Sequence, residues 1–442
     1  MEARRIAFEV LVNIKTEQAY SNNALAEAFK TADLSDKDKA LVTEIVYGTL
    51  TNYRLLDFYL EPYYVGRVKD WVKTLLAMSL YQLLYLKRIP DYAAINEAVE
   101  IAKGRGGDFN AKVVNSILRK VTVAKELRSL DEVEDEIEQL SIKYSHPTWL
   151  ARLWNAQFGR KRTEAMMLAS TKRAQMVLRA NESLITRDEL LIKLTSEGLT
   201  VQPGLLGKAA ILVTAGNPLI TDSFAQGLFY VQDEASQLPA VALSPELGSA
   251  VLDVCAAPGG KTFHLAQMVG GEGVVYAHDI YEHKIARLRE NAQRLKVTNT
   301  NFSVCSAMDL DSKYAKESFD FILVDAPCSG LGIIRRHPEV KMAKQPADLD
   351  EIVQVQADIL NSAARFLRPG GRLVYSTCTV NKKENHRQVE EFLKKNDKFE
   401  IDADFVGRMP SELESNIESG MLQLFPQDFA TDGFFIASLI KK

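Results

Sequence analysis

The 442-residue chain has few cysteines, and they stand far apart in the sequence. The four are Cys255, Cys305, Cys328 and Cys378, and none forms a CxxC pair. This spacing disfavours a disulfide framework and a zinc site, and no metal site of another kind is predicted. We therefore expect the protein to work in a reducing cytoplasm with its thiols free for chemistry.

The sequence also lacks a long apolar run and a strong net charge. No segment approaches the roughly 18 apolar residues of a membrane span. The first residues, MEARRIAFEVLVNIK, carry charges inside their apolar pattern, which argues against a secretory signal. A formal net charge of −4 does not indicate a general nucleic-acid binder. We expect a globular protein, monomeric and not associated with a membrane.

Charge is nevertheless unevenly distributed along the chain. Residues 126–140 contain seven acids and one arginine, whereas residues 141–180 contain eight lysines or arginines and only one acid, Glu164. Two interpretations remain open for the basic run. It is either a solvated helix face or a surface that follows RNA phosphates.

Apolar periodicity divides the chain into three predicted domains. Residues 1–125 repeat apolar positions at intervals of three and four, which predicts an all-α bundle of six or seven helices, interrupted at GRGGDFN. Residues 126–235 predict a linker and a small α+β subdomain, with strands at MVLRAN and AAILVTA. Residues 236–442 alternate short apolar strands with helices, which predicts a parallel sheet covered by helices on both faces. The six predicted strands are AVLDV, GVVYAHD, NFSVCS, DFILVD, GRLVYST and FFIASLI.

The residues best suited to chemistry follow the strands of this third domain. Ligands of such sheets bind beyond the carboxyl ends of the strands. The candidate residues at those ends are Asp253, Cys255, Asp279, Asp309, Asp325, Cys328 and Cys378.

The segment VLDVCAAPGGKT predicts a cofactor loop between a strand and a helix. Its small residues allow close approach to a ligand, and the helix start offers free N–H groups to an anion. The glycines match neither GxGxxG nor GxxxxGK[ST]. Asp279, 26 residues after Asp253, is placed to accept from both ribose hydroxyls, and Asp309 from an adenine amino group. S-adenosylmethionine suits this pattern better than NADP, because no arginine closely follows Asp279.

Three motifs together resemble a known family. DVCAAPGGKT, DAPCSG followed by RRHPE, and YSTCTVNKKEN are similar to motifs of the RNA cytosine-C5 methyltransferases of the NOL1/NOP2/Sun group. The segment GLFYVQDEASQLP also resembles the sequence before the cofactor motif in that group. In the N-terminal third, LYQLLYLKRIPDYAAINEAVEIAK resembles a NusB-like RNA-binding domain. This combination occurs in bacterial enzymes that act on 16S rRNA.

The resemblance implies a Rossmann-like, S-adenosylmethionine-dependent methyltransferase domain and a set of site residues. It implies Cys378 as the nucleophile that adds to C6 of cytosine, Cys328 as a group that assists product release, and Asp325 as the residue that activates the base. The implied cofactor-binding residues are Cys255, Ala256, Ala257, Pro258, Gly259, Gly260, Lys261, Asp279, Asp309 and Asp325. Arg335, Arg336 and His337 are candidates for contacts with RNA phosphates.

Several alternatives stay open at this stage. DNA cytosine methyltransferases use the thiol after a proline, so Cys328 is the alternative nucleophile. The substrate is alternatively tRNA, or the protein is a non-catalytic RNA-binding assembly factor. Cys305 is expected to be a small buried residue of the core. Asn381, Glu384 and Asn385 either cap the next helix or support the site.

Overall fold

The computed structural model describes residues 2–17, 19–124 and 126–442, and it divides into two compact units. The first unit comprises Met1–Arg173 and Ile334–Lys344. The second comprises Ala174–Ile333 and Gln345–Lys442. The short segment Ile334–Lys344 therefore belongs to the helical unit, although its neighbours in sequence on both sides belong to the other unit.

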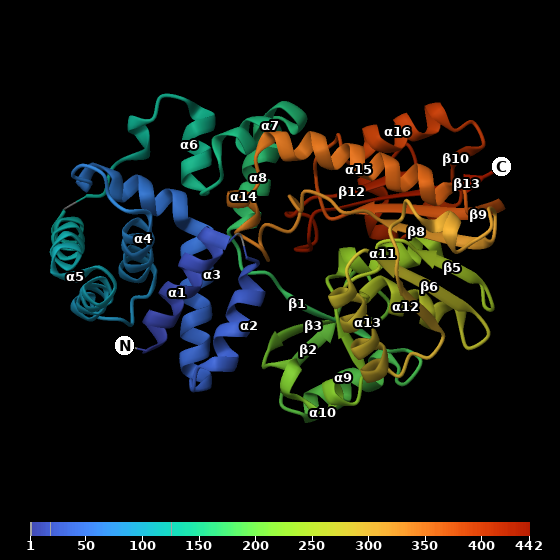
Figure 1. Cartoon of the computed structure of the whole chain (residues 1–442), viewed down its shortest axis with the longest axis horizontal. Coiled ribbons are helices and arrows are strands. Elements are labelled where there is room, and N and C mark those ends of the chain that lie inside the picture. The colour runs from blue at the N-terminus through green and yellow to red at the C-terminus, as the bar shows by residue number, and fades with distance from the viewer. Residues whose placement is uncertain (1, 18, 125) are drawn as a thin grey trace. The chain divides into compact units, whose positions relative to one another are not determined.

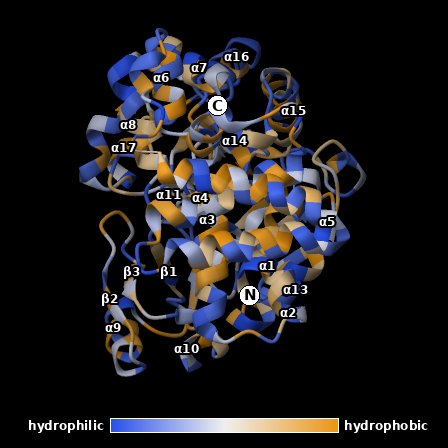
Figure 2. Cartoon of the chain, turned by 90° about the vertical axis from the view of Figure 1, so that its left-hand side faces the viewer, coloured by the Kyte–Doolittle hydropathy of each residue, from blue (hydrophilic) through white to orange (hydrophobic). Residues whose placement is uncertain are grey.

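The first unit is helical, as the apolar periodicity predicts (Figure 1). Phe8, Leu50 and Leu76 are fully buried in its core, and the helices in Figure 2 carry both hydrophobic and hydrophilic residues. The predicted interruption at GRGGDFN is a kink at Gly107, whose φ of 74° and ψ of −178° are non-helical and divide Asp91–Val123 into two helical segments. The helices are α1 Glu2–Glu17, α2 Ser21–Thr31, α3 Asp36–Leu60, α4 Asp70–Tyr85, α5 Asp91–Val123, α6 Glu136–Lys143, α7 Thr148–Phe158, α8 Arg160–Ser170 and α14 Val340–Ala343.

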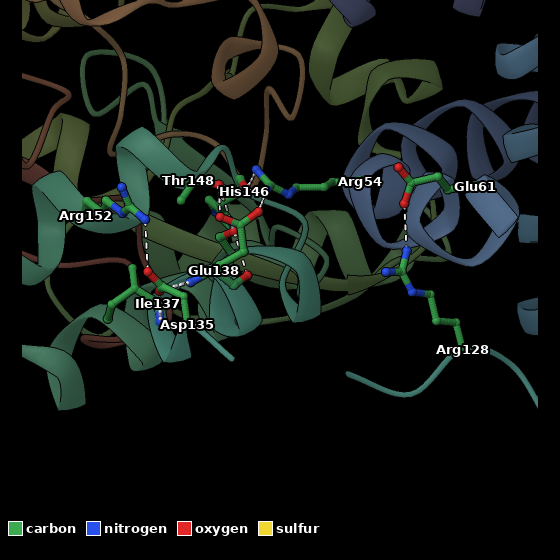
Figure 3. Close-up of polar contacts among 10 residues, drawn as sticks. Arg54, Glu61, Arg128, Asp135, Ile137, Glu138, His146, Thr148 and Arg152 are labelled. Carbon is green, nitrogen blue, oxygen red and sulfur yellow. Dashed lines mark hydrogen bonds and ion pairs between the residues drawn. The ribbon is translucent and has the colours of Figure 1, made fainter. Parts of the chain in front are cut away.

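A polar cluster joins α6 and α7 to α3 (Figure 3). Arg54 of α3 donates to Glu138 at 2.7 Å, to Thr148 at 2.7 Å and to the His146 carbonyl at 3.1 Å. Asp135 caps α6 by accepting from the Ile137 and Glu138 amides. This cluster holds the acidic segment against the bundle.

Two ion pairs link the acidic run of the sequence to the basic run. Arg152 bonds to Asp135 at 3.0 Å, and Arg160 pairs with Glu136. Arg179, the last basic residue of the run, is buried in the second unit. These contacts give Arg152 and Arg160 partners within the protein, and both interpretations of the rest of the basic run stay predictions.

The second unit begins with a small antiparallel sheet in the order β2-β3-β1-β4. MVLRAN and AAILVTA form strands, as predicted, and the helix between them starts at a capping box formed by Thr186 and Glu189. The elements are β1 Met176–Ala180, α9 Arg187–Ser196, β2 Thr200–Pro203, β3 Ala210–Ala215, α10 Asp222–Ala225 and β4 Phe229–Val231.

The large sheet of this unit has the order β11-β12-β13-β9-β8-β5-β6-β7, with β10 paired to β13. All six predicted strands are present, and five of them are parallel. The prediction of a wholly parallel sheet is wrong, because the C-terminal strand β13 runs antiparallel to β9 and carries β10 and β12 antiparallel beside it. The strands are β5 Ala250–Asp253, β6 Val274–Asp279, β7 Thr300–Val304, β8 Phe319–Asp325, β9 Leu367–Thr377, β10 Phe399–Ile401, β11 Ile417–Glu418, β12 Met421–Leu424 and β13 Phe434–Lys441.

Helices cover both faces of this sheet, as predicted (Figure 1). Alternate residues of one strand enter different cores: Ile322 and Val324 join the cluster beneath α15, whereas Leu323 joins the cluster beneath α11 and α12. The helices are α11 Glu234–Leu243, α12 Gly260–Val269, α13 Glu282–Leu295, α15 Pro346–Ala364, α16 His386–Lys395 and α17 Phe405–Arg408. In the described part of the chain, no helix has the length and apolar character of a membrane span.

Candidate active site

The strand order places the candidate site at a reversal of the sheet topology. Strands β5, β6 and β7 add in one direction, and β8 returns to pair with the other side of β5. A crevice forms beyond the carboxyl ends of the strands at such a switch point. Asp253 ends β5 and Asp325 ends β8, so these two carboxyl groups flank it.

The predicted glycine loop is a tight turn into α12. Gly259 has a φ of +107°, and a Cβ there would lie 2.4 Å from Phe263. A Cβ at Gly260 would lie 3.0 Å from Tyr230. Arg179, buried beneath the loop, donates to the Gly260 carbonyl, and burial lowers the pKa of Arg179 to about 10. The subdomain strand β1 therefore supports the loop from behind.

Asp253 forms the buried floor of this loop. It is 1% exposed and accepts from the Thr262 hydroxyl at 2.7 Å. Its other carboxyl oxygen has no partner within the described chain. Burial raises the pKa of Asp253 to about 7, and the nearby charge of Asp325 acts in the same direction.

The two carboxylates assigned to adenosine differ in placement. Asp279 ends β6, is 6% exposed, and accepts from the Tyr281 amide and Lys284, each at 3.3 Å. Asp309 does not close the third strand as predicted, because β7 ends at Val304 and the chain then turns inward at buried Cys305. Asp309 is exposed at the start of a 3₁₀ turn.

These features fit a nucleoside cofactor with an unmodified ribose. The turn at Gly259 opens α12, Asp253 lies buried at the end of β5, and Asp279 presents a carboxylate at the next strand end. The predicted loop residues from Cys255 to Lys261 are contiguous with this turn. Burial raises the pKa of the half-buried Cys255 thiol, which is consistent with a structural part of the loop.

Two side chains from distant segments hold the Asp325 carboxylate. Lys261 donates to one carboxylate oxygen at 2.8 Å, and Ser376 donates to the other at 2.8 Å. Lys261 also reaches the Ser236 hydroxyl at 3.2 Å. Lys261 belongs to the cofactor loop and Ser376 belongs to β9. The sequence shows the two motifs separately, but it does not show that these side chains meet at Asp325.

The two predicted catalytic thiols lie together. Cys328 Sγ and Cys378 Sγ are 3.2 Å apart, and both residues are half-buried. The hydrogen bond with Cys378 and burial both raise the pKa of Cys328. Cys305 instead packs in the core, as expected. In the described residues, no three His, Cys, Asp or Glu side chains are grouped to hold a metal ion.

The predicted RNA-contacting residues belong to the first unit. Arg335 is buried, and Arg336 and His337 are half-buried. His337 bonds to Glu339 at 3.2 Å and packs edge-on against the Tyr20 ring. The structure brings these three residues into the helical unit and leaves their proposed RNA contact untested.

Comparison with known proteins identifies the family. The family described as "16S rRNA methyltransferase RsmB/F" matches residues 240–440, and the NusB family matches residues 1–123. A ferredoxin-like domain of RsmF/B-like methyltransferases matches residues 146–219. The chain is 40% identical to the probable ribosomal RNA small subunit methyltransferase B of Bacillus subtilis, over 99% of this chain and 98% of that protein. The chain belongs to the RsmB/F family of 16S rRNA methyltransferases.

Another relative and two solved structures are also similar to the chain. A Synechocystis protein named probable ribosomal RNA small subunit methyltransferase B is 33% identical over the full length of both chains. The crystal structure of PH0851 has a TM-score of 0.85 at 26% identity, over 99% of this chain and 98% of that one. NSun6 from Pyrococcus horikoshii shares the fold, with a TM-score of 0.60 at 22% identity, over 67% of this chain and 98% of that one.

Membership of the RsmB/F family confirms the resemblance seen in the sequence. It also confirms the NusB-like bundle, the small α+β subdomain, the Rossmann-like methyltransferase domain and the methyl donor, S-adenosylmethionine. The domain boundaries at residues 125 and 235 stay predictions.

Proposed function

We propose that this RsmB/F-family chain methylates C5 of a cytosine in 16S ribosomal RNA through a covalent bond between a cysteine and C6 of the base. The observation that carries the proposal is the pair of half-buried sulfurs of Cys328 and Cys378, 3.2 Å apart at the carboxyl ends of β8 and β9. S-adenosylmethionine, when bound, supplies an electrophilic methyl group. The remaining chemistry belongs to residues of the chain.

Cys378 is the proposed nucleophile. Its thiolate adds to C6, the electrons of the C5–C6 double bond move toward C5, and C5 becomes nucleophilic enough to accept a methyl carbon. Asp325 is proposed to accept from the N4 amino group of the base with one oxygen and to share a proton with N3 through the other. Because Lys261 and Ser376 each hold one of its oxygens, the Asp325 carboxylate is already oriented when the base arrives.

Cys328 is proposed to assist product release. After the transfer, C5 carries both a methyl group and a proton. Cys328 Sγ, after releasing its own proton to solvent, accepts the proton from C5, the electrons of the C5–H bond re-form the C5–C6 double bond, and the C6–S bond breaks. The electron pair of that bond returns to Cys378 Sγ, which restores the starting thiolate.

The RNA contact surface is proposed to include the first unit. The NusB-like helices and the segment with Arg335, Arg336 and His337 are candidates for phosphate contacts. Arg336 and His337 are half-buried and so remain partly accessible, whereas Arg335 is buried.

Bisulfite sequencing of 16S rRNA tests this function. A strain that lacks the protein should lose protection of one cytosine, and wild-type protein should restore it whereas Cys378→Ala should not. Protection lost from a tRNA instead would favour the tRNA alternative. Full protection restored by Cys378→Ala, together with no binding of S-adenosylmethionine by calorimetry, would favour a non-catalytic assembly factor.

A further inference from the structure

One buried carboxylate of the second unit has no role in the mechanism above. Glu384 is 0% exposed and lies six residues after Cys378, in the turn before α16. A buried carboxylate requires hydrogen-bond partners, and the identity of those partners indicates its role.

The partners of Glu384 come from both cysteine-bearing loops. On the Cys328 side, it accepts from the Ser329 amide at 2.8 Å and the Ser329 hydroxyl at 2.6 Å. On the Cys378 side, it accepts from Asn381 at 3.1 Å and Thr379 at 3.4 Å. Ser329 and Thr379, each next to a cysteine in sequence, also bond to each other at 2.8 Å.

Further contacts fix this turn to the surrounding structure. Gln356 of α15 donates both to Glu384 at 3.1 Å and to the Pro327 carbonyl at 2.9 Å. The Tyr375 hydroxyl donates to the Glu384 carbonyl at 2.8 Å. Every group that meets the Glu384 side chain is a donor, which is the pattern that an ionised carboxylate requires.

We propose that Glu384 is a positioning residue that fastens the Cys328 loop to the Cys378 loop and keeps the proton of the thiol pair on Cys328. The inference rests on the proposed covalent mechanism, in which Cys378 is the attacking sulfur. The negative charge of Glu384 sits on the amide that follows Cys328, so it disfavours a second negative charge on Cys328 Sγ. Cys328 then donates its S–H to Cys378.

The other titratable groups around the Cys328–Cys378 pair do not have the same effect on the Cys328 thiol as Glu384. Asp325 and Lys261 bond to each other at 2.8 Å, so their charges largely offset each other. Tyr375 stays neutral, because burial raises its pKa. The hydrogen bond with Cys378 and burial contribute most to the raised pKa of Cys328, and the charge of Glu384 acts in the same direction. Once Cys378 is bonded to the base, its hydrogen bond with Cys328 is lost, and Cys328 becomes free to release its proton to solvent and accept one from C5.

The test separates charge from geometry with two substitutions. Glu384→Gln removes the charge and keeps an oxygen that accepts from Ser329, whereas Glu384→Ala removes both. Glu390→Gln, an exposed position on α16, is the matched control. Initial rates of alkylation by iodoacetamide are measured for Cys328 and Cys378 by mass spectrometry across pH, on the full chain without RNA or methyl donor.

We expect Glu384→Gln to move the pH midpoint of Cys328 alkylation about one unit lower than in wild type and in Glu390→Gln. We expect single-turnover methylation by Glu384→Ala to slow by about 100-fold with KM for RNA little changed, since a displacement of the thiols by about 1 Å has that cost. Glu384→Gln should retain more activity than Glu384→Ala.

An unchanged Cys328 midpoint in Glu384→Gln would overturn the inference. So would equal kcat values for Glu384→Ala and wild type. If Glu384→Ala fails to fold, the alkylation result with Glu384→Gln still decides. Because alkylation needs no RNA, a failure here is distinct from a failure of the proposed function, which would appear as no methylation of 16S rRNA by the wild-type protein.

Discussion

The buried carboxyl of Asp253 makes the stability of the second unit depend on pH. Asp253 is 1% exposed, and burial raises its pKa from 3.8 to about 7. Between these values the folded chain holds a proton on Asp253 that the unfolded chain has released. The free energy of unfolding therefore falls as pH rises from about 4 to 7, because the folded state must then bury the charge. Asp253→Asn removes this dependence.

The size of the effect follows from the shift. The difference between about 7 and 3.8 is about three units, and each unit corresponds to about 1.36 kcal/mol, so full ionisation costs ~4 kcal/mol. About two of these units lie between pH 5 and the pKa in the folded protein. The free energy of unfolding should therefore fall by ~3 kcal/mol from pH 5 to pH 8. The amide introduced by Asp253→Asn keeps an oxygen that accepts from Thr262 and cannot ionise, so the variant should lack this loss.

The assay must report on the second unit alone. The three tryptophans, Trp71, Trp149 and Trp154, all belong to the first unit, so their fluorescence does not follow β5. Hydrogen exchange of peptides from β5 and β8, measured over a urea series at pH 5 and pH 8, gives the local free energy of opening.

The quantity to compare is the change in the free energy of opening between pH 5 and pH 8, in wild type and in Asp253→Asn. Asp397→Asn, at an exposed position of the same unit, serves as the control and should follow wild type. If Asp253→Asn shows the same pH dependence as wild type within about 0.5 kcal/mol, the group is not buried in the way described, and the reasoning fails.

Three further perturbations test other parts of the structure. Gly259→Ala should weaken S-adenosylmethionine binding at least 10-fold by calorimetry, because a Cβ at φ +107° would lie 2.4 Å from Phe263. Lys341, buried in the first unit with its pKa lowered to about 7 from 10.5, should make that unit more stable as pH rises from 7 to 10. Tryptophan fluorescence should show that Lys341→Met abolishes this rise. Arg54→Ala should destabilise the first unit by about 1–3 kcal/mol in urea unfolding, because Glu138 loses its partner.

Each of these has a clear contradicting result. Unchanged donor affinity in Gly259→Ala would remove the glycine turn from the cofactor site. A stability that falls from pH 7 to 10 in wild type, or an equal rise in Lys341→Met, would contradict the buried lysine. An Arg54→Ala chain as stable as wild type would show that the polar cluster contributes nothing to the first unit.

Much of the site was predictable because its residues stand next to strand ends in the sequence. Asp253, Asp279, Asp325 and Cys378 each end or follow an apolar strand, and the direction of parallel strands brings such ends to one edge. The glycine turn could be predicted for the same reason, because it follows the end of β5.

The contacts that orient the site were not predictable, because they join segments far apart in the chain. Lys261 and Asp325 are separated by 64 residues, and Ser329 and Glu384 by 55. No local pattern encodes such pairings. Asp309 does not lie at the predicted strand end, because β7 ends at Val304. The residue that follows the strand is Cys305, which is buried.

The edge of the large sheet shows a related limit. FFIASLI is a strand by its composition, but its direction depends on how the chain returns to the sheet. The alternation of strands and helices predicted a parallel strand, whereas β13 pairs antiparallel with β9. Likewise, the sequence did not show that Arg152 and Arg160 of the basic run pair with Asp135 and Glu136 of the acidic run.

The most direct test of the covalent mechanism is to identify the cysteine that bonds to RNA. Cys328→Ala protein is incubated with 16S rRNA and S-adenosylmethionine, nuclease is added, and the modified peptide is sequenced by mass spectrometry, with Cys305→Ala as a control. The account predicts a stable adduct in Cys328→Ala, with a methylated cytosine on the peptide that contains Cys378, and no accumulation in Cys305→Ala. An adduct on Cys328 in Cys378→Ala protein, with none in Cys328→Ala, would contradict it.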